Sequence, residues 1–239
     1  MSTPRPLRLV VEESARLADV AAQWMAAAIE TDQRERGHCT VALAGGRTPQ
    51  PVYERLACPP FASRIRWQDL DVYFGDERGV PPDDPASNFR MAQLALFERV
   101  PIPPARVHRM EAERTERDAA ARAYEAVLPE RLDVLLLGMG ADGHTASLFP
   151  GAAALEETAR RVVAVTGPTP PAERLTITPP VIAAARRVAI LATGADKAET
   201  VARALGEPLR PRDLPVQLAL RGVWFLDVAA GAHVNRGAT

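Results

Sequence analysis

The fold is decided by the stretch CTVALAGGRTP at residues 39–49, in which an apolar run is followed by two glycines and a helix start. The run at 39–44 has no alternation of polar and apolar residues, which is typical of a parallel strand covered on both faces. Gly45 and Gly46 end the strand, and Pro49 suits the first turn of a helix that reaches residue 57. A strand that passes into a helix in this way is the unit of an α/β fold.

The same unit recurs on both sides of this stretch. Apolar runs predict further strands at 7–11, 70–74, 133–137, 162–165, 175–178, 187–192 and 223–226. Helical patterns lie at 13–36, 87–99, 114–128 and 196–205, and a polar loop is expected at 75–85. Strands that alternate with helices imply right-handed crossovers and a mostly parallel sheet. We therefore predict one α/β domain over residues 1–239.

The composition excludes several classes of protein. The chain has 239 residues, of which 47% are hydrophobic, and a net charge of -1, so it is not disordered and has no global attraction to nucleic acid or anionic membranes. No run approaches the ~20 apolar residues of a membrane span. Residues 1–6 contain no apolar signal segment, and Cys39 and Cys58 have no metal-ligand or redox spacing. These features predict a cytoplasmic protein with unpaired cysteines.

Ligands of open parallel sheets bind beyond the carboxyl ends of the strands, and the loop at 44–49 lies at such an end. Gly45 and Gly46 allow close approach of the backbone to an anion, while Arg47 and Thr48 supply donors for phosphate oxygens. A tight turn without a ligand is the alternative. The loop has neither nucleotide-binding glycine motif, so nucleotides are not favoured.

Three further cations are candidates for anion binding. Arg78 ends the sequence Gly-Asp-Glu-Arg at 75–78, where Asp76 or Glu77 could orient it. Arg174 precedes a short predicted strand, and Lys197 lies one turn into a predicted helix. The loop at 193–195 before Lys197 resembles an anion cradle. The alternative is that these charges simply face solvent.

The loop GMGADGHTASLFP at 138–150 follows the most apolar predicted strand. His144 is the side chain best suited to proton transfer near neutral pH, and Asp142 could contact the imidazole or the ligand. A structural role for this histidine is the alternative. His38, His108 and His233 have no comparable setting, and no second His or Cys lies at ligand spacing, so we expect no metal.

At these loops the sequence resembles the 6-phosphogluconolactonases. The resemblance rests on residues 44–49, 74–78 with 87–91, 138–151, 173–176 and 224–227. It implies a Rossmann-like α/β fold and hydrolysis of 6-phospho-glucono-1,5-lactone without cofactor or metal. It places the catalytic histidine at His144 and its partner at Asp142. The substrate and phosphate would be bound by Gly45, Gly46, Arg47, Thr48, Arg78, Arg174 and Lys197.

One departure from the family pattern lies in the first loop, which commonly reads Ser-Gly-Gly-Ser-Thr-Pro. Ala44 and Arg47 stand in place of the two serines, so two hydroxyl donors are lost and one guanidinium is gained. We expect His144 to take a proton from water that attacks the lactone carbonyl. The expected assembly is a monomer, with a dimer as the alternative.

Two other functions remain as alternatives. An amino-sugar-phosphate isomerase or deaminase would use Asp76 as the base, but Phe149 stands where those enzymes carry a glutamate, and Arg78 replaces their usual tyrosine. A sugar-phosphate-binding regulatory domain would carry an N-terminal helix-turn-helix, for which the first predicted strand leaves no room. The resemblance implies that the glucosamine-6-phosphate deaminases share the expected fold.

Overall fold

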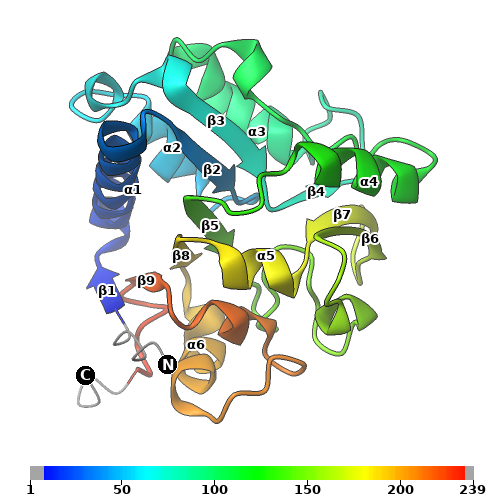
Figure 1. Ribbon diagram of the computed structural model, residues 1–239. Helices are drawn as coiled ribbons and strands as arrows, with labels where there is room; N and C mark the ends of the chain where they lie inside the picture. Colours follow the sequence, from blue (N-terminus) through cyan, green and yellow to red (C-terminus); the bar gives the residue numbers. More distant parts are fainter. Residues whose placement is uncertain (1–7, 235–239) are drawn as a thin grey trace.

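The computed structural model describes residues 8–234, in which six parallel strands form the central sheet in the order β1-β9-β8-β5-β2-β3 (Figure 1). The prediction of a mostly parallel sheet is confirmed. Leu7, expected to begin the first strand, lies outside the described residues. The strands of this sheet are β1 (Arg8–Glu12), β2 (Cys39–Leu43), β3 (Leu70–Phe74), β5 (Val134–Gly138), β8 (Arg187–Ala192) and β9 (Val223–Asp227).

Helices cover both faces of the sheet, which explains why its strands lack alternation. Val134 and Leu136 of β5 pack into one apolar core, while Leu135 and Leu137 pack into a second core on the opposite face. The first core contains α1 (Ser14–Arg36), α2 (Gln50–Leu56) and α3 (Asn88–Ala95). The second contains α4 (Arg117–Val127), α5 (Pro179–Ala184) and α6 (Ala198–Gly206), of which α5 was not predicted.

A second, antiparallel sheet has the strand order β4-β7-β6 and corrects two predictions. It consists of β4 (Asp76–Arg78), β6 (Val162–Thr166) and β7 (Glu173–Ile177). The expected polar loop at 75–85 therefore begins with a strand, and the two short strands near residues 162 and 175 do not join the parallel sheet. Gly75 is the junction, since its N–H donates to Leu43 of β2 and its carbonyl accepts from Ile177 of β7, each at 2.9 Å.

Two of the predicted helices are shorter than expected, because a 3-10 turn takes up one end of each predicted range. The expected helix at 87–99 is α3 followed by a turn at Phe97–Arg99, and α6 is preceded by a turn at Ala195–Lys197. Gly37 closes α1 in the left-handed conformation with φ 80°, and its N–H donates to Gln33 at 3.0 Å. Lys197 thus lies in the turn before α6 and not inside the helix.

The amino ends of the sheet strands carry a buried ion-pair network instead of a ligand site. Asp133 accepts from Thr40 Oγ1 at 3.0 Å and pairs with Arg36 and Arg186. Asp32 pairs with Arg187 at 2.6 Å and with Arg36 at 3.0 Å, beside the Sγ of buried Cys39. Both cysteines are unpaired, as predicted. Although Asp32, Cys39 and Asp133 lie within metal-binding reach of one another, the arginines already neutralise the carboxylates.

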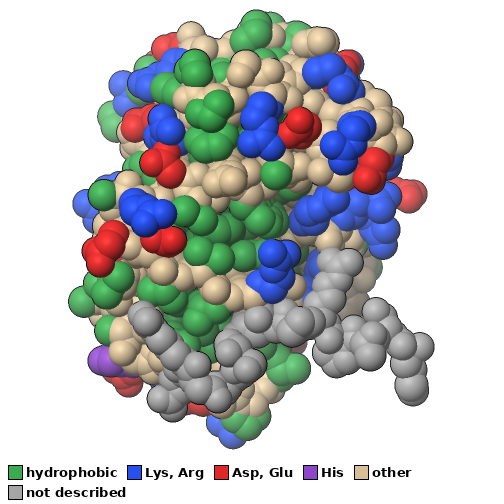
Figure 2. All heavy atoms as spheres, turned by 90° about the vertical axis from the view of Figure 1, so that its left-hand side faces the viewer, with side chains coloured by type: hydrophobic (Ala, Val, Ile, Leu, Met, Phe, Trp, Pro, Cys, Tyr) green, Lys and Arg blue, Asp and Glu red, His purple; other side chains and the backbone are tan. Residues whose placement is uncertain are grey.

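Basic and acidic side chains are interspersed over much of the face that carries α1, with a hydrophobic strip between them (Figure 2). On this face the charges do not form the continuous basic patch that is typical of nucleic-acid binding. No helix within residues 8–234 has the length and apolar character that a membrane crossing demands.

Candidate active site

A cleft of about 280 Å³ opens at the carboxyl ends of β2, β3 and β5. His144 and all the predicted substrate-binding residues line it, so the structure brings together residues that span more than half of the sequence. Asp142 does not line the cleft but forms a hydrogen bond with the ring of His144. The lining also includes Asp76, Met139 and Ala146. Convergence of a histidine, a carboxylate and several cations in one cleft is the pattern of a catalytic or binding site.

The imidazole of His144 is held by Asp142. Its Nδ1 lies 2.6 Å from Asp142 Oδ1, and the same oxygen accepts the backbone N–H of His144 at 3.1 Å. The hydrogen bond with His144 is the main reason that the pKa of Asp142 lies below its usual range. Gly140 makes this arrangement possible, because a Cβ at that position would lie 2.1 Å from His144 Nδ1.

The loop that carries His144 is tied to the second sheet. Thr145 Oγ1 donates to the carbonyl of Gly138 at 2.8 Å, and the N–H of Ser147 donates to Thr176 Oγ1 at 3.1 Å. Phe149 packs its ring 4.8 Å from the centre of the His144 ring. These contacts fix the position of the loop and therefore the position of the His144 ring in the cleft.

Arg78 and Arg174 are directly opposite one another in the antiparallel β4–β7 pair. Arg78 Nη1 donates to the carbonyl of Ala86 at 2.7 Å, and Arg174 Nε donates to the carbonyl of Pro171 at 3.2 Å. Arg174 is only 7% exposed, and burial lowers its pKa. A guanidinium remains charged in proteins despite such a shift, so both residues present positive charge to the cleft.

The expectation that Asp76 or Glu77 orients the Arg78 guanidinium is wrong. Glu77 accepts the backbone N–H groups of Arg78, Asn88 and Phe89, each at 2.8 Å, and so caps the start of α3. Burial raises the pKa of Glu77. Asp76 instead accepts from Ser147 Oγ at 2.6 Å and from Asn88 Nδ2 at 3.2 Å.

Asn88 and Ser147 are site residues that sequence reasoning did not single out. Both are buried, and together they hold the Asp76 carboxylate at the wall of the cleft. Asn88 also packs on Gly45, where a Cβ would lie 2.0 Å from its Oδ1. The only available signal was that Asn88 and Ser147 fall inside the sequence stretches that carry the family resemblance.

The loop between β2 and α2 presents free donors. The backbone N–H groups of Gly45, Gly46 and Thr48 form no hydrogen bond within residues 8–234. Thr48 Oγ1 lies 3.0 Å from Thr193 Oγ1, which joins this loop to the one before Lys197. Lys197 Nζ donates to Asp196 at 2.9 Å and lines the cleft.

The segment 193–195 is not the anion cradle that we expected. The N–H of Gly194 donates to both carboxylate oxygens of Asp227 at 3.1 Å, so it is not available to a ligand. His108 also contacts a carboxylate, since its Nε2 lies 2.9 Å from Asp71 Oδ1 and its ring stacks on Tyr73 at 4.5 Å, but this pair does not line the cleft.

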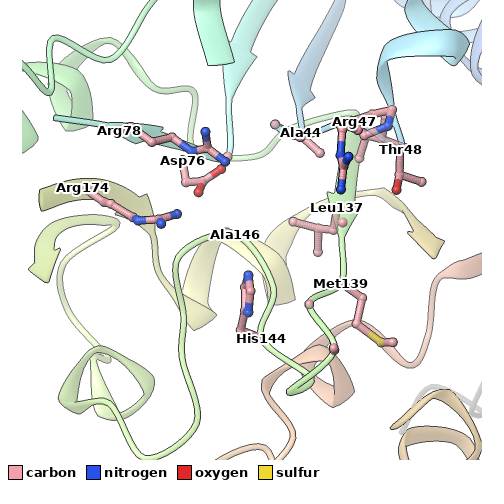
Figure 3. A pocket seen from close by; sticks show the side chains of 18 of the residues that line it. Ala44, Arg47, Thr48, Asp76, Arg78, Leu137, Met139, His144, Ala146 and Arg174 are labelled. Carbon is pink, nitrogen blue, oxygen red and sulfur yellow. The ribbon is translucent and has the colours of Figure 1, made fainter. Parts of the chain in front are cut away.

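Figure 3 shows the cations on two sides of the histidine. Arg78 and Arg174 lie on one side of His144, next to Asp76, while Arg47 and Thr48 lie on the other side. Lys197 belongs with Arg47 and Thr48, because these three also line a neighbouring cavity of about 410 Å³ that Arg78 and Arg174 do not reach. With cations on both sides and His144 between them, the cleft could bind an anionic molecule whose central atoms lie next to the imidazole.

The fold and the cleft define an α/β protein with a cation-lined cleft at the carboxyl ends of its parallel strands. The family model described as glucosamine-6-phosphate isomerases/6-phosphogluconolactonase matches residues 12–225. The chain therefore belongs to this family.

Relatives over nearly the full length agree with this assignment. A Streptomyces coelicolor protein named 6-phosphogluconolactonase is 40% identical over 97% of this chain and 95% of its own length. A Synechocystis protein of the same name is 39% identical over 84% of this chain and 87% of its own. The solved structure of 6-phosphogluconolactonase from Trypanosoma brucei has a TM-score of 0.85 and 28% identity, covering 97% of this chain and all (100%) of that one.

Proposed function

We propose that this chain hydrolyses 6-phospho-D-glucono-1,5-lactone to 6-phospho-D-gluconate, the lactone-opening step of the oxidative pentose phosphate pathway. The observation that carries the proposal is the His144–Asp142 pair, which faces a cleft with cations on both sides. The full-length similarity to proteins named 6-phosphogluconolactonase supports the same substrate.

His144 acts as the general base in this proposal. Asp142 accepts a hydrogen bond from the N–H at Nδ1, which leaves Nε2 of the neutral ring to take a proton from water. The water oxygen bonds to C1 of the lactone, and the carbonyl oxygen becomes an oxyanion that nearby cations stabilise. When the intermediate collapses, the bond from C1 to the ring oxygen breaks, and the imidazolium returns its proton to that oxygen. The new acid group then ionises to a carboxylate.

The test is lactone opening at controlled pH with the uncatalysed background subtracted. His144→Ala should lower kcat by roughly 10²- to 10⁴-fold, the amount that general-base catalysis supplies, with little change in KM. Hydrolysis at the native rate in this variant would remove His144 from the mechanism.

The amino-sugar-phosphate isomerase or deaminase activity is disfavoured by Phe149. Its ring occupies the position at which the deaminases carry a glutamate, and a phenyl group cannot transfer a proton. We therefore expect no ammonia release from glucosamine 6-phosphate. We also propose a cytoplasmic monomer that needs no cofactor or metal. Full turnover after dialysis against a chelator and the mass in solution by light scattering test this proposal.

A further inference from the structure

Strands β2 and β5 separate from one another before β5 ends. β2 pairs with β3 over its full length, whereas its pairing with β5 stops at Ala42 and Leu135. β5 nevertheless stays paired with β8, on its other side, up to Gly138. Residues 136–138 of β5 line the cleft together with Ala44, the residue that follows β2. The cleft therefore begins where these two neighbouring strands part.

Separation of the strands leaves the backbone of Ala44 without a neighbour in the sheet. Alternate residues of a parallel strand bond to the same neighbour, and Thr40 accepts from Asp133 beside β5 at 3.1 Å, so Ala44 also faces β5. The hydroxyl of Tyr53 takes the place of that strand, since it accepts the Ala44 N–H at 2.9 Å and donates to the Ala44 carbonyl at 2.8 Å. Both residues are buried, so without this hydroxyl two polar groups would be left unpaired. Burial raises the pKa of Tyr53, which keeps the hydroxyl protonated and able to donate.

Tyr53 also holds the far end of the loop that follows β2. Its backbone N–H donates to the carbonyl of Pro49 at 3.2 Å, so one residue ties down both ends of the 44–49 loop. Three backbone N–H groups in this loop form no hydrogen bond within the described part of the chain. The side chain of Thr48 provides a further contact, with Thr193 at 3.0 Å. With few hydrogen bonds of its own, the loop depends on Tyr53 for its position against the sheet.

We propose that Tyr53 is a positioning residue for the lactone hydrolysis, in which its hydroxyl holds β2 apart from β5 and so sets the distance between the 44–49 loop and His144. This inference rests on the proposed function. β5 leads directly into the loop that carries His144, whereas β2 leads into the 44–49 loop. Ala44 lies across the cleft from His144 (Figure 3). A change in the spacing of the two strands therefore changes the fit of a substrate that touches both loops.

Tyr124 provides a matched control, because its hydroxyl makes the same pair of contacts with the end of β3. It accepts the N–H of Phe74 at 2.8 Å and donates to the Phe74 carbonyl at 3.3 Å, and its side chain is also buried. The next residue is held independently, since Gly75 bonds to Leu43 and Ile177. Loss of the Tyr124 hydroxyl should therefore destabilise the protein to a similar degree without moving a loop of the cleft.

Steady-state lactone hydrolysis and urea unfolding of Tyr53→Phe and Tyr124→Phe test the proposal. Both variants should be destabilised to a similar degree, since each loses two buried hydrogen bonds. The KM of Tyr53→Phe should rise roughly 10-fold or more, whereas the KM of Tyr124→Phe should stay within about twofold of the native value. A merely structural role would reduce the amount of folded enzyme, which lowers the apparent kcat and leaves KM unchanged. A native KM in Tyr53→Phe would overturn the inference.

Amide hydrogen exchange followed by NMR tests the Tyr53 contact without the reaction. In the native protein the Ala44 N–H should exchange as slowly as the strand-paired N–H of Ala42, and Tyr53→Phe should speed its exchange roughly 10-fold or more. Rapid exchange at Ala44 in the native protein would overturn the inference even if the variant did not fold. A native protein that does not open the lactone removes the proposed function. Normal hydrolysis by the native protein, with an unchanged KM in Tyr53→Phe, removes only this inference.

Discussion

The guanidinium of Arg174 lies over the ring of Phe149, with 5.5 Å between its central carbon and the ring centre. The same ring contacts His144, so one aromatic side chain lies between the proposed general base and a proposed substrate-binding cation. Gly167 packs directly against Arg174 and Phe149, because a Cβ at position 167 would lie 3.0 Å from Arg174 Nε and from two Phe149 ring atoms. The position of the imidazole and that of the guanidinium therefore depend on a shared apolar surface.

Phe149→Leu should lower kcat/KM by roughly 3- to 30-fold, because the ring that contacts His144 and Arg174 is lost while the site stays apolar. Both kcat and KM should change, since one contact serves the base and the other a cation. Steady-state lactone hydrolysis measures the effect. Phe149→Tyr keeps the ring and should stay close to native, and Phe97→Leu, in a separate aromatic cluster, should have no effect. Unchanged constants in Phe149→Leu would contradict a positioning role.

Asp142→Asn should reduce kcat by up to roughly 10²-fold, because the ring of His144 loses its hydrogen bond to a charged carboxylate. The hydrogen bond with His144 lowers the pKa of Asp142, so this carboxylate keeps its charge as pH falls below the ordinary pKa of an aspartate. The ratio of native to variant kcat should therefore stay constant from neutral pH down to that ordinary pKa. Steady-state lactone hydrolysis over this pH range is the measurement. Equal kcat values for the native protein and the variant would show that the pair at 2.6 Å does not act in catalysis.

Gly45→Ala should lower the free energy of unfolding by about 1–3 kcal/mol, the usual cost of overpacking. The new methyl group would overlap the Asn88 side chain, which would have to leave Asp76. Urea unfolding measures the loss, and adding Asn88→Ala should restore part of it. Gly206→Ala is the matched control, since a Cβ there meets nothing within 4 Å. Equal stability of the two single variants would be incompatible with the close approach of Asn88 to Gly45.

The strands of the parallel sheet and the location of the cleft could be predicted because they depend on local pattern. An unbroken apolar run such as 134–137 must be covered on both faces of the sheet. The loops that follow parallel strands all lie at the same edge of the sheet, where the strands end. The residues of those loops, among them His144 and Lys197, accordingly meet in one cleft. The pairing of β4 with β7 could not be predicted, because the two strands lie about 100 residues apart and β4 consists of three charged residues without a hydrophobic pattern.

The amino-acid sequence by itself determined the alternation of strands and helices, the glycines that allow close backbone approach, and the histidine beside an aspartate two positions earlier. Tertiary structure alone decided which polar groups are satisfied. It directs the Gly194 N–H to Asp227, commits Glu77 to the start of α3, and leaves Arg78 facing Arg174. The physical reason is that hydrogen-bond partners are chosen by proximity in space, and a pattern of residue types along the chain does not specify which distant groups will meet.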